Sequence, residues 1–203
     1  LQSIDASTLD SGATLGLTSE SSSAIRSLAL GVAGAGAAGV TVTAMGNAVA
    51  NTVSSDITDS TVTAANDIDV LAQDIAPSLI PAWLVPADKA AELNTNLVDS
   101  PVSLDANILA VNVNIAGSGG AAVTVGITGN TITNSVVADI VNSSVESTGG
   151  SLDLDALSKA GIIAITAGVS GAGGAAINAT GYGNVIVNTV DASITSGSTV
   201  TTG

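Results

Sequence analysis

Three stretches of the chain are near-copies of one another, and they decide the fold. They read GAGAAGVTVTAMGNAVANTVSSDITDSTV from Gly34 to Val62, GSGGAAVTVGITGNTITNSVVADIVNSSV from Gly117 to Val145, and GAGGAAINATGYGNVIVNTVDASITSGSTV from Gly171 to Val200. Self-similarity of this kind is the sequence signature of a repeat architecture. The chain is therefore expected to stack similar units along one axis.

The spacing of the copies gives the length of the repeat. Ile25 and Ile108 are equivalent and 83 residues apart, whereas Ile108 and Ile162 are equivalent and 54 apart, so the first interval holds an insertion of about 29 residues. We expect the conserved apolar places of each repeat to point into the core. The first place is Ile57, Ile140 or Ile194, and the second is Val62, Val145 or Val200. In an N-terminal partial copy, Ile4 occupies the first place and Leu9 the second.

The residue pattern inside the repeat favours β-strands. Short apolar runs alternate with polar residues and are rich in Val, Ile and Thr, with Gly, Asn, Asp and Ser between them. Aromatic residues make up 1% of the chain, which fits a narrow interior. We therefore predict an all-β fold over residues 1–203, a right-handed parallel β-helix with two to three coils per repeat. Neither end looks capped, so we expect a single segment of a longer array.

One segment differs from the rest in composition. Residues 75–102 hold all four prolines, Lys89 and the only tryptophan, Trp83. Proline cannot donate to a sheet ladder, so this segment is predicted to be a loop or flap inserted into the β-helix, with a short helix at 87–97. Trp83 is our candidate partner-binding residue, and packing of its ring on the β-helix wall is the alternative.

Asparagine recurs in every copy as Gly-Asn-x-x-x-Asn. Asparagine at one place in successive coils can stack as a hydrogen-bonded ladder, and we expect such ladders inside turns. This interpretation makes the residues structural and not catalytic. The predicted ladder residues are Asn47, Asn51, Asn130, Asn134, Asn184 and Asn188.

Two pairs of carboxylates are the candidates for binding chemistry. Asp67 and Asp69, and likewise Asp153 and Asp155, alternate with apolar residues, so each pair is expected to face outward from one strand. We interpret them as solvated acids, and weak Ca²⁺ binding is the alternative. The sequence predicts no catalytic centre, no cofactor and no tight metal site.

The overall composition excludes several classes of protein. The chain has 203 residues, 3 basic and 17 acidic side chains, a net charge of −14, no His and no Cys. These counts exclude Ser-His-Asp and Cys-His catalysis and disulfides, and they argue against nucleic acid as a partner. A glycine fingerprint at Gly34, Gly36 and Gly39 suits a dinucleotide site, but the segment after it alternates like a strand. Three uncharged stretches reach the length of a membrane helix, but they alternate too, so we do not expect a transmembrane protein.

The succession of a glycine-rich segment with Val-Thr-Val, then Gly-Asn-x-x-x-Asn, then Asp-Ile-x-x-Ser-x-Val resembles large bacterial exoproteins of the filamentous-haemagglutinin type. These are passengers of two-partner secretion and related autotransporter adhesins. The resemblance covers nearly the whole chain except the insertion. It implies a β-helical rod outside the cell, at the outer surface, which contacts a host or neighbouring-cell surface through glycan or protein.

The expected function is therefore that of a non-enzymatic structural and adhesive rod. A self-assembling extracellular filament or surface-layer unit, with end-to-end or lateral self-association, is the alternative. A polysaccharide-active β-helix enzyme is the least favoured class, because the paired carboxylates have no basic residue close in sequence except Lys159.

Overall fold

The computed structural model describes residues 1–79 and 105–203, and this part of the chain contains fourteen β-strands and no helix. The strands form four sheets, and every pair of neighbouring strands is parallel. We call them the long, end, return and arm sheets. The long sheet holds β1 (Gln2–Asp5), β5 (Ala38–Thr58), β9 (Ala121–Val141) and β13 (Ala175–Thr195), and the end sheet β2 (Thr8–Ser11), β6 (Thr61–Ala64), β10 (Ser144–Ser147) and β14 (Thr199–Thr202). The return sheet holds β3 (Leu15–Ser21), β7 (Ile68–Ile75) and β11 (Leu152–Lys159), and the arm sheet β4 (Ile25–Ala35), β8 (Ile108–Ser118) and β12 (Ile162–Ala172).

Each repeat builds one layer, which we define as one strand in each of the four sheets. The first layer is β3 to β6, the second β7 to β10 and the third β11 to β14, while β1 and β2 pair with the first layer from its other side. The prediction of two to three coils per repeat is wrong. The prediction failed because β5, β9 and β13 are continuous strands of 21 residues each. The Gly-Asn segment lies inside these strands and not in a turn.

The alignment of the repeats is confirmed by the strand register. Ile57 lies beside Ile140, and Ile140 beside Ile194. Val62, Val145 and Val200 are likewise neighbours, and Ile4 and Leu9 of the partial copy pair with Ile57 and Val62. Equivalent residues of successive repeats therefore lie directly above one another.

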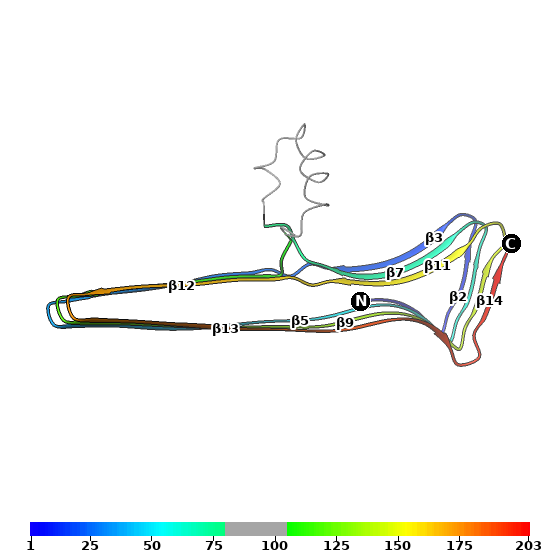
Figure 1. The fold of residues 1–203 in the computed structure, drawn as a ribbon. Helices are drawn as coiled ribbons and strands as arrows, with labels where there is room; N and C mark the ends of the chain where they lie inside the picture. Colours follow the sequence, from blue (N-terminus) through cyan, green and yellow to red (C-terminus); the bar gives the residue numbers. More distant parts are fainter. Residues whose placement is uncertain (80–104) are drawn as a thin grey trace, which may run out of the picture.

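The molecule has a wide end and a narrow arm (Figure 1). The long sheet runs along its whole length, and the return and end sheets close a triangle with the second half of that sheet. The arm consists of the arm sheet and the part of the long sheet that faces it, namely residues 38–49, 121–132 and 175–186. Each layer is thus a long, flat outline and not a compact triangle.

A large apolar cluster fills the triangle, and a smaller one around Ile108 and Ile132 lies at the base of the arm. Ile57 and Ile140 are completely buried in the triangle, in one cluster with Val62, Val145 and Ile68. Ile194 takes the equivalent inward place in the third layer, but 48% of its surface is exposed because no strand of the described residues pairs with the outer edge of β13. The prediction that Ile57, Ile140 and Ile194 all face inward fits this register. An inward side chain is completely buried only where a strand pairs with its own strand on both sides.

The chain turns from the long sheet into the end sheet through one left-handed residue at each of the first three corners and two, Ser196 and Gly197, at the last. Ala6, Asp59, Asn142 and Ser196 have φ values of 45°, 50°, 48° and 55°. Asp and Asn tolerate this conformation better than most residues. The bend is reinforced where Asn142 Nδ2 donates to Asp59 Oδ1 at 2.5 Å.

The described part of the chain locates the insertion between β7 and β8. Ile75 still belongs to β7, and Ala76 N donates to Lys159 O as part of the layer. The chain rejoins the layer where Ala106 N donates to Pro77 O at 3.0 Å. The predicted start at residue 75 is therefore slightly early. Trp83 and the predicted helix at 87–97 lie outside the described residues.

Deletion of residues 77–105 is predicted to leave the layers intact. It would join β7 to β8 through Ala76, Ala106 and Asn107, which matches the three residues between β3 and β4 in the first layer. We expect the free energy of unfolding to change by no more than about 1 kcal/mol, because closing a shorter connection has a small entropic effect. Thermal and denaturant unfolding would measure it. A deletion variant that cannot fold would show that the segment belongs to a layer.

Candidate functional site

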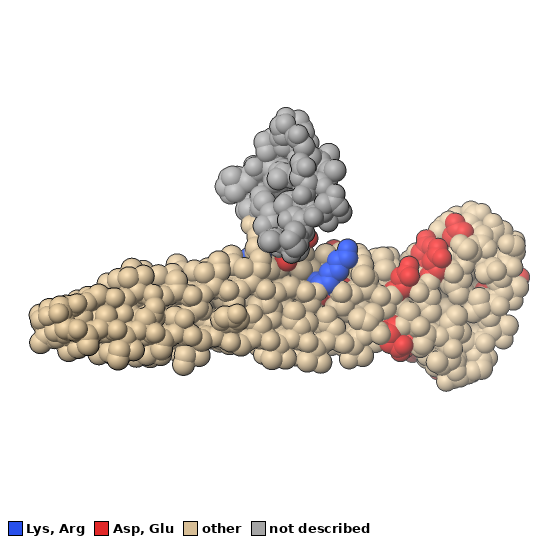
Figure 2. All heavy atoms as spheres, in the orientation of Figure 1, with Lys and Arg blue, Asp and Glu red and all other residues tan. Residues whose placement is uncertain are grey.

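In the arm, polar side chains lie mainly inside and apolar side chains outside, which is the reverse of the arrangement at the wide end. Arg26, at its base, is the only charged residue of the arm. The narrow part of the molecule shows no charged side chain toward its tip in Figure 2. The side chains that point between its two sheets are mainly Thr, Asn, Gly and Ala, whereas Leu, Val and Ile point outward. A water-exposed sheet normally buries its apolar face, so this inversion needs a physical explanation.

The interior of the arm is held by hydrogen bonds between side chains of the two sheets. Thr43 Oγ1 donates to Asn114 Oδ1 at 2.8 Å, and Asn112 Nδ2 donates to Thr128 Oγ1 at 3.2 Å. Asn112 and Asn114 are completely buried. Buried amides are stable only when they find partners, so this network fixes the two sheets relative to each other.

Glycines let the two sheets of the arm approach closely. A Cβ on Gly126 would lie 2.5 Å from Asn114 Nδ2 of the opposite sheet. In the neighbouring layers the sizes are reversed, because Gly31 and Gly168 of the arm sheet face Thr41 and Asn178 of the long sheet. Large and small side chains thus alternate across the gap, as in a well-packed core.

This packing predicts different effects for two glycines of β9. Gly126→Ala should lower the free energy of unfolding by roughly 1–3 kcal/mol, the range for overpacking a close-packed interior. Gly129→Ala is the matched control, because Gly129 faces outward with no atom within 4 Å of its added Cβ. The control should be neutral or stabilising by about 0.5–1 kcal/mol, since alanine loses less backbone entropy than glycine. Denaturant unfolding compares them, and equal effects would refute the close approach.

Half of the predicted asparagines form a ladder across the layers. Asn47 Nδ2 donates to Asn130 Oδ1 at 2.8 Å, and Asn130 Nδ2 donates to Asn184 Oδ1 at 2.8 Å. The ladder runs through the middle of β5, β9 and β13, so the expectation that it lies inside a turn is wrong. At the base of the arm, Asn47 lies between Met45 and Val49, which belong to the small apolar cluster around Ile108 and Ile132.

Two of the other three asparagines bind a buried carboxylate that sequence reasoning missed. Asp74 is completely buried and accepts hydrogen bonds from Asn51 Nδ2 at 2.7 Å and Asn134 Nδ2 at 2.5 Å. Asn188 occupies the equivalent place in the third layer, beside Asn134. The alternation of Ile68, Val70 and Ala72 puts Asp74 on the inward face and could have revealed it.

Asp74 gives a second pair of contrasting variants. Asp74→Ala should lower the free energy of unfolding by about 2 kcal/mol or more, because two buried amide donors lose their acceptor. Asp69→Ala, on the outward face of β7, should change it by no more than about 0.5 kcal/mol. Thermal unfolding at neutral pH tests both variants. A neutral result for Asp74→Ala would mean that the amides find other acceptors.

A serine ladder also escaped the sequence analysis. Ser60 Oγ donates to Thr58 O at 2.6 Å and accepts from Ser7 N at 3.1 Å, and Ser143 and Ser198 repeat this arrangement one and two layers further on. These are the serines of the repeated Ser-x-Val motif. Each of these serines accepts a hydrogen bond from the backbone N–H of the equivalent serine in the neighbouring layer, so the same bond joins successive corners.

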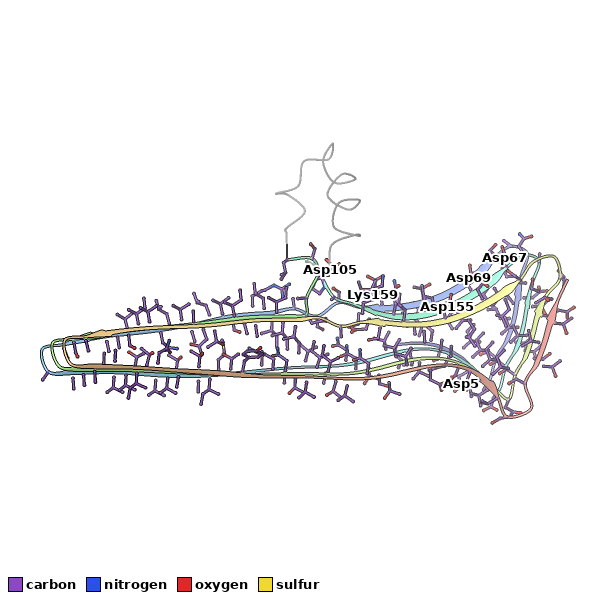
Figure 3. All side chains as sticks on the ribbon, in the orientation of Figure 1. Asp5, Asp67, Asp69, Asp105, Asp155 and Lys159 are labelled. Atoms are coloured by element: carbon purple, nitrogen blue, oxygen red, sulfur yellow. The ribbon has the colours of Figure 1, made fainter. Side chains whose placement is uncertain are left out.

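The four candidate calcium ligands are not brought together. Asp67 Oδ1 accepts from Ser151 N at 2.9 Å in the turn before β7. Asp69 and Asp153 are neighbours on β7 and β11, and Asp155 is next to Leu71 (Figure 3). Within residues 1–79 and 105–203, no three Asp, Glu, His or Cys residues form a group that could hold a metal ion.

The outward faces of the arm carry most of the large apolar side chains that the structure shows exposed. On β4, Leu28 is 73% and Val32 69% exposed. On the opposite side of the arm, Val40 and Val42 of β5 are exposed as well. Acidic residues gather instead at the wide end of the molecule (Figure 2).

The chain matches no protein-family model, no curated protein and no solved structure. In the described part of the chain, no helix has the length and apolar character needed to cross a membrane. The layered structure and its surfaces are therefore the basis for a functional proposal.

Proposed function

We propose that the chain is a segment of a right-handed parallel β-helix that serves as a non-enzymatic structural and adhesive rod. We place it in a large secreted or cell-surface bacterial exoprotein that contacts other cells or surfaces. The observation that carries the proposal is the in-register stacking of equivalent residues from layer to layer. The right hand follows from the general preference of connections between parallel strands.

The third layer supplies the main support for a longer rod. Ile186, Val190 and Ile194 face inward but are about half exposed, at 46%, 48% and 48%. The outer edges of β11 to β14 pair with no strand in the described part of the chain. A further layer would bury these apolar side chains and continue the Asn184 ladder, as the second layer does for the first.

The same open edge favours the alternative function, a self-assembling extracellular filament or surface-layer unit. A second copy could supply the next layer as well as a further repeat of the same chain could. The two functions therefore share one rod and differ in whether assembly or surface contact is the end result.

Assembly tests the rod directly. At rising protein concentration, electron microscopy and sedimentation should show particles that lengthen along the stacking axis. Ile194→Lys places a charge on the open inward face and should stop lengthening, because a buried unpaired charge is costly. Thr189→Lys, on the outward face of the same strand, should leave lengthening unchanged. Equal lengthening of both variants and the unmodified chain would contradict stacking through this edge.

Surface contact can be separated from assembly with coated beads. Beads carrying the Ile194→Lys chain should still bind bacterial or host cells if the rod is adhesive through its sides. Loss of binding together with lengthening would favour the filament. Turnover of a polysaccharide by the chain would overturn the non-enzymatic proposal.

A further inference from the structure

The outer surface of the arm sheet is a flat apolar face without a partner in the described chain. We call it the outer arm face and define it as three rows of three residues, one from each layer. Nothing in folding requires these residues to be apolar, because the sheet is fixed from inside by its Thr and Asn network. The rows are Leu28, Val111 and Ile165, then Leu30, Val113 and Ala167, then Val32, Ile115 and Val169.

We propose that the outer arm face binds the outer arm face of a second copy of this chain, with the two wide ends at opposite ends of the pair. This inference deepens the proposed function, because it names the lateral partner of the rod. Large exposed apolar patches on soluble chains mark interaction sites, and flat sheets pack face to face about 10 Å apart.

The distribution of charge determines the orientation. The net charge is −14, and the arm contributes only Arg26 to it. A parallel pair would bring two acidic wide ends together, and like charges repel. An opposed pair overlaps only the arms, which hold no acidic residue, and keeps the wide ends far apart. The taper of the arm toward its tip leaves room for this overlap (Figure 2).

The area of the arm sheet explains why the strength of pairing would depend on the number of layers in the rod. Strands of 11 residues in three layers give the whole outward side of the arm sheet, with the outer arm face in its middle, a flat area of about 500 Å² per copy, at about 3.3 Å per residue and about 4.8 Å per strand. The pair would bury about 1,000 Å² in total, the lower limit for a specific interface. A three-layer chain should therefore pair weakly, and every added layer should strengthen pairing.

Sedimentation of matched triple variants tests the face. In the Ile194→Lys background, which blocks stacking, the chain should show a monomer–dimer equilibrium at high micromolar concentration. Leu28→Thr with Leu30→Thr and Val32→Thr should weaken it at least tenfold, whereas Val40→Thr with Val42→Thr and Ile127→Thr, on the opposite outward face, should not. A chain that stays monomeric up to 1 millimolar (a concentration chosen on the order of weak interfaces), or equal weakening by both triples, would overturn the proposal.

Cross-linking tests the orientation of the two copies. Because the chain has no cysteine of its own, a single introduced cysteine is the only thiol that can react. Leu109, Val113 and Gly117 lie along the outward side of β8, with Val113 midway between the others. With a short bis-maleimide, Val113→Cys should link to itself. Leu109→Cys should link to Gly117→Cys but not to itself. Self-linking of Leu109→Cys would indicate a parallel pair and contradict the opposed arrangement.

Two further measurements separate this inference from its rivals. Ile194→Lys should abolish lengthening but keep the dimer, so failure of stacking and failure of lateral pairing can be told apart. Flotation with neutral phosphatidylcholine vesicles tests lipid as the occupant. Vesicle binding by a monomeric chain, lost in the Leu28, Leu30 and Val32 triple, would overturn pairing between copies, whereas no flotation supports it.

Discussion

The structure depends on the stacking of identical side chains in register between layers. Parallel pairing places each residue of one repeat beside its equivalent in the next, so any side chain that can bond to a copy of itself gains a partner. Asn47, Asn130 and Asn184 do this through their amides, and the corner serines do it through hydroxyl and backbone groups. Sequence repetition is thus the condition under which a polar interior becomes stable.

The same condition explains the inverted arm. Along most of the arm the two sheets are separated mainly by Gly, Ala, Thr and Asn, and large apolar side chains such as Ile108 and Ile132 are buried only at its base. The two sheets can instead satisfy each other's polar groups. Large apolar residues are therefore on the outside, away from the charges of the wide end. The triangle has space for Ile57, Ile68 and Ile140 and holds a larger apolar cluster than the base of the arm does.

Much of this was predictable from sequence, and the failures have physical causes. The offsets of the repeats predicted the register of Ile57, Ile140 and Ile194 because parallel stacking preserves residue equivalence. The number of coils per repeat was predicted wrongly because Gly46 and Asn47 resemble a turn while lying inside a strand. Alternation in the segment from Val111 to Ile115 identifies two faces but does not say which one is buried. Asp74 was overlooked, although its place in the alternation of β7 puts it on the same inward face as Val70 and Ala72.

The separation of equivalent residues tests the central claim, that one repeat makes one layer. Thr52 and Thr189 face outward on β5 and β13, two layers apart with Ser135 between them. With cysteine introduced at both positions, spin labels should show strong dipolar broadening from a backbone separation of about 10 Å, twice the strand spacing. Two layers per repeat would double this separation to about 20 Å, and loss of the broadening would contradict the account.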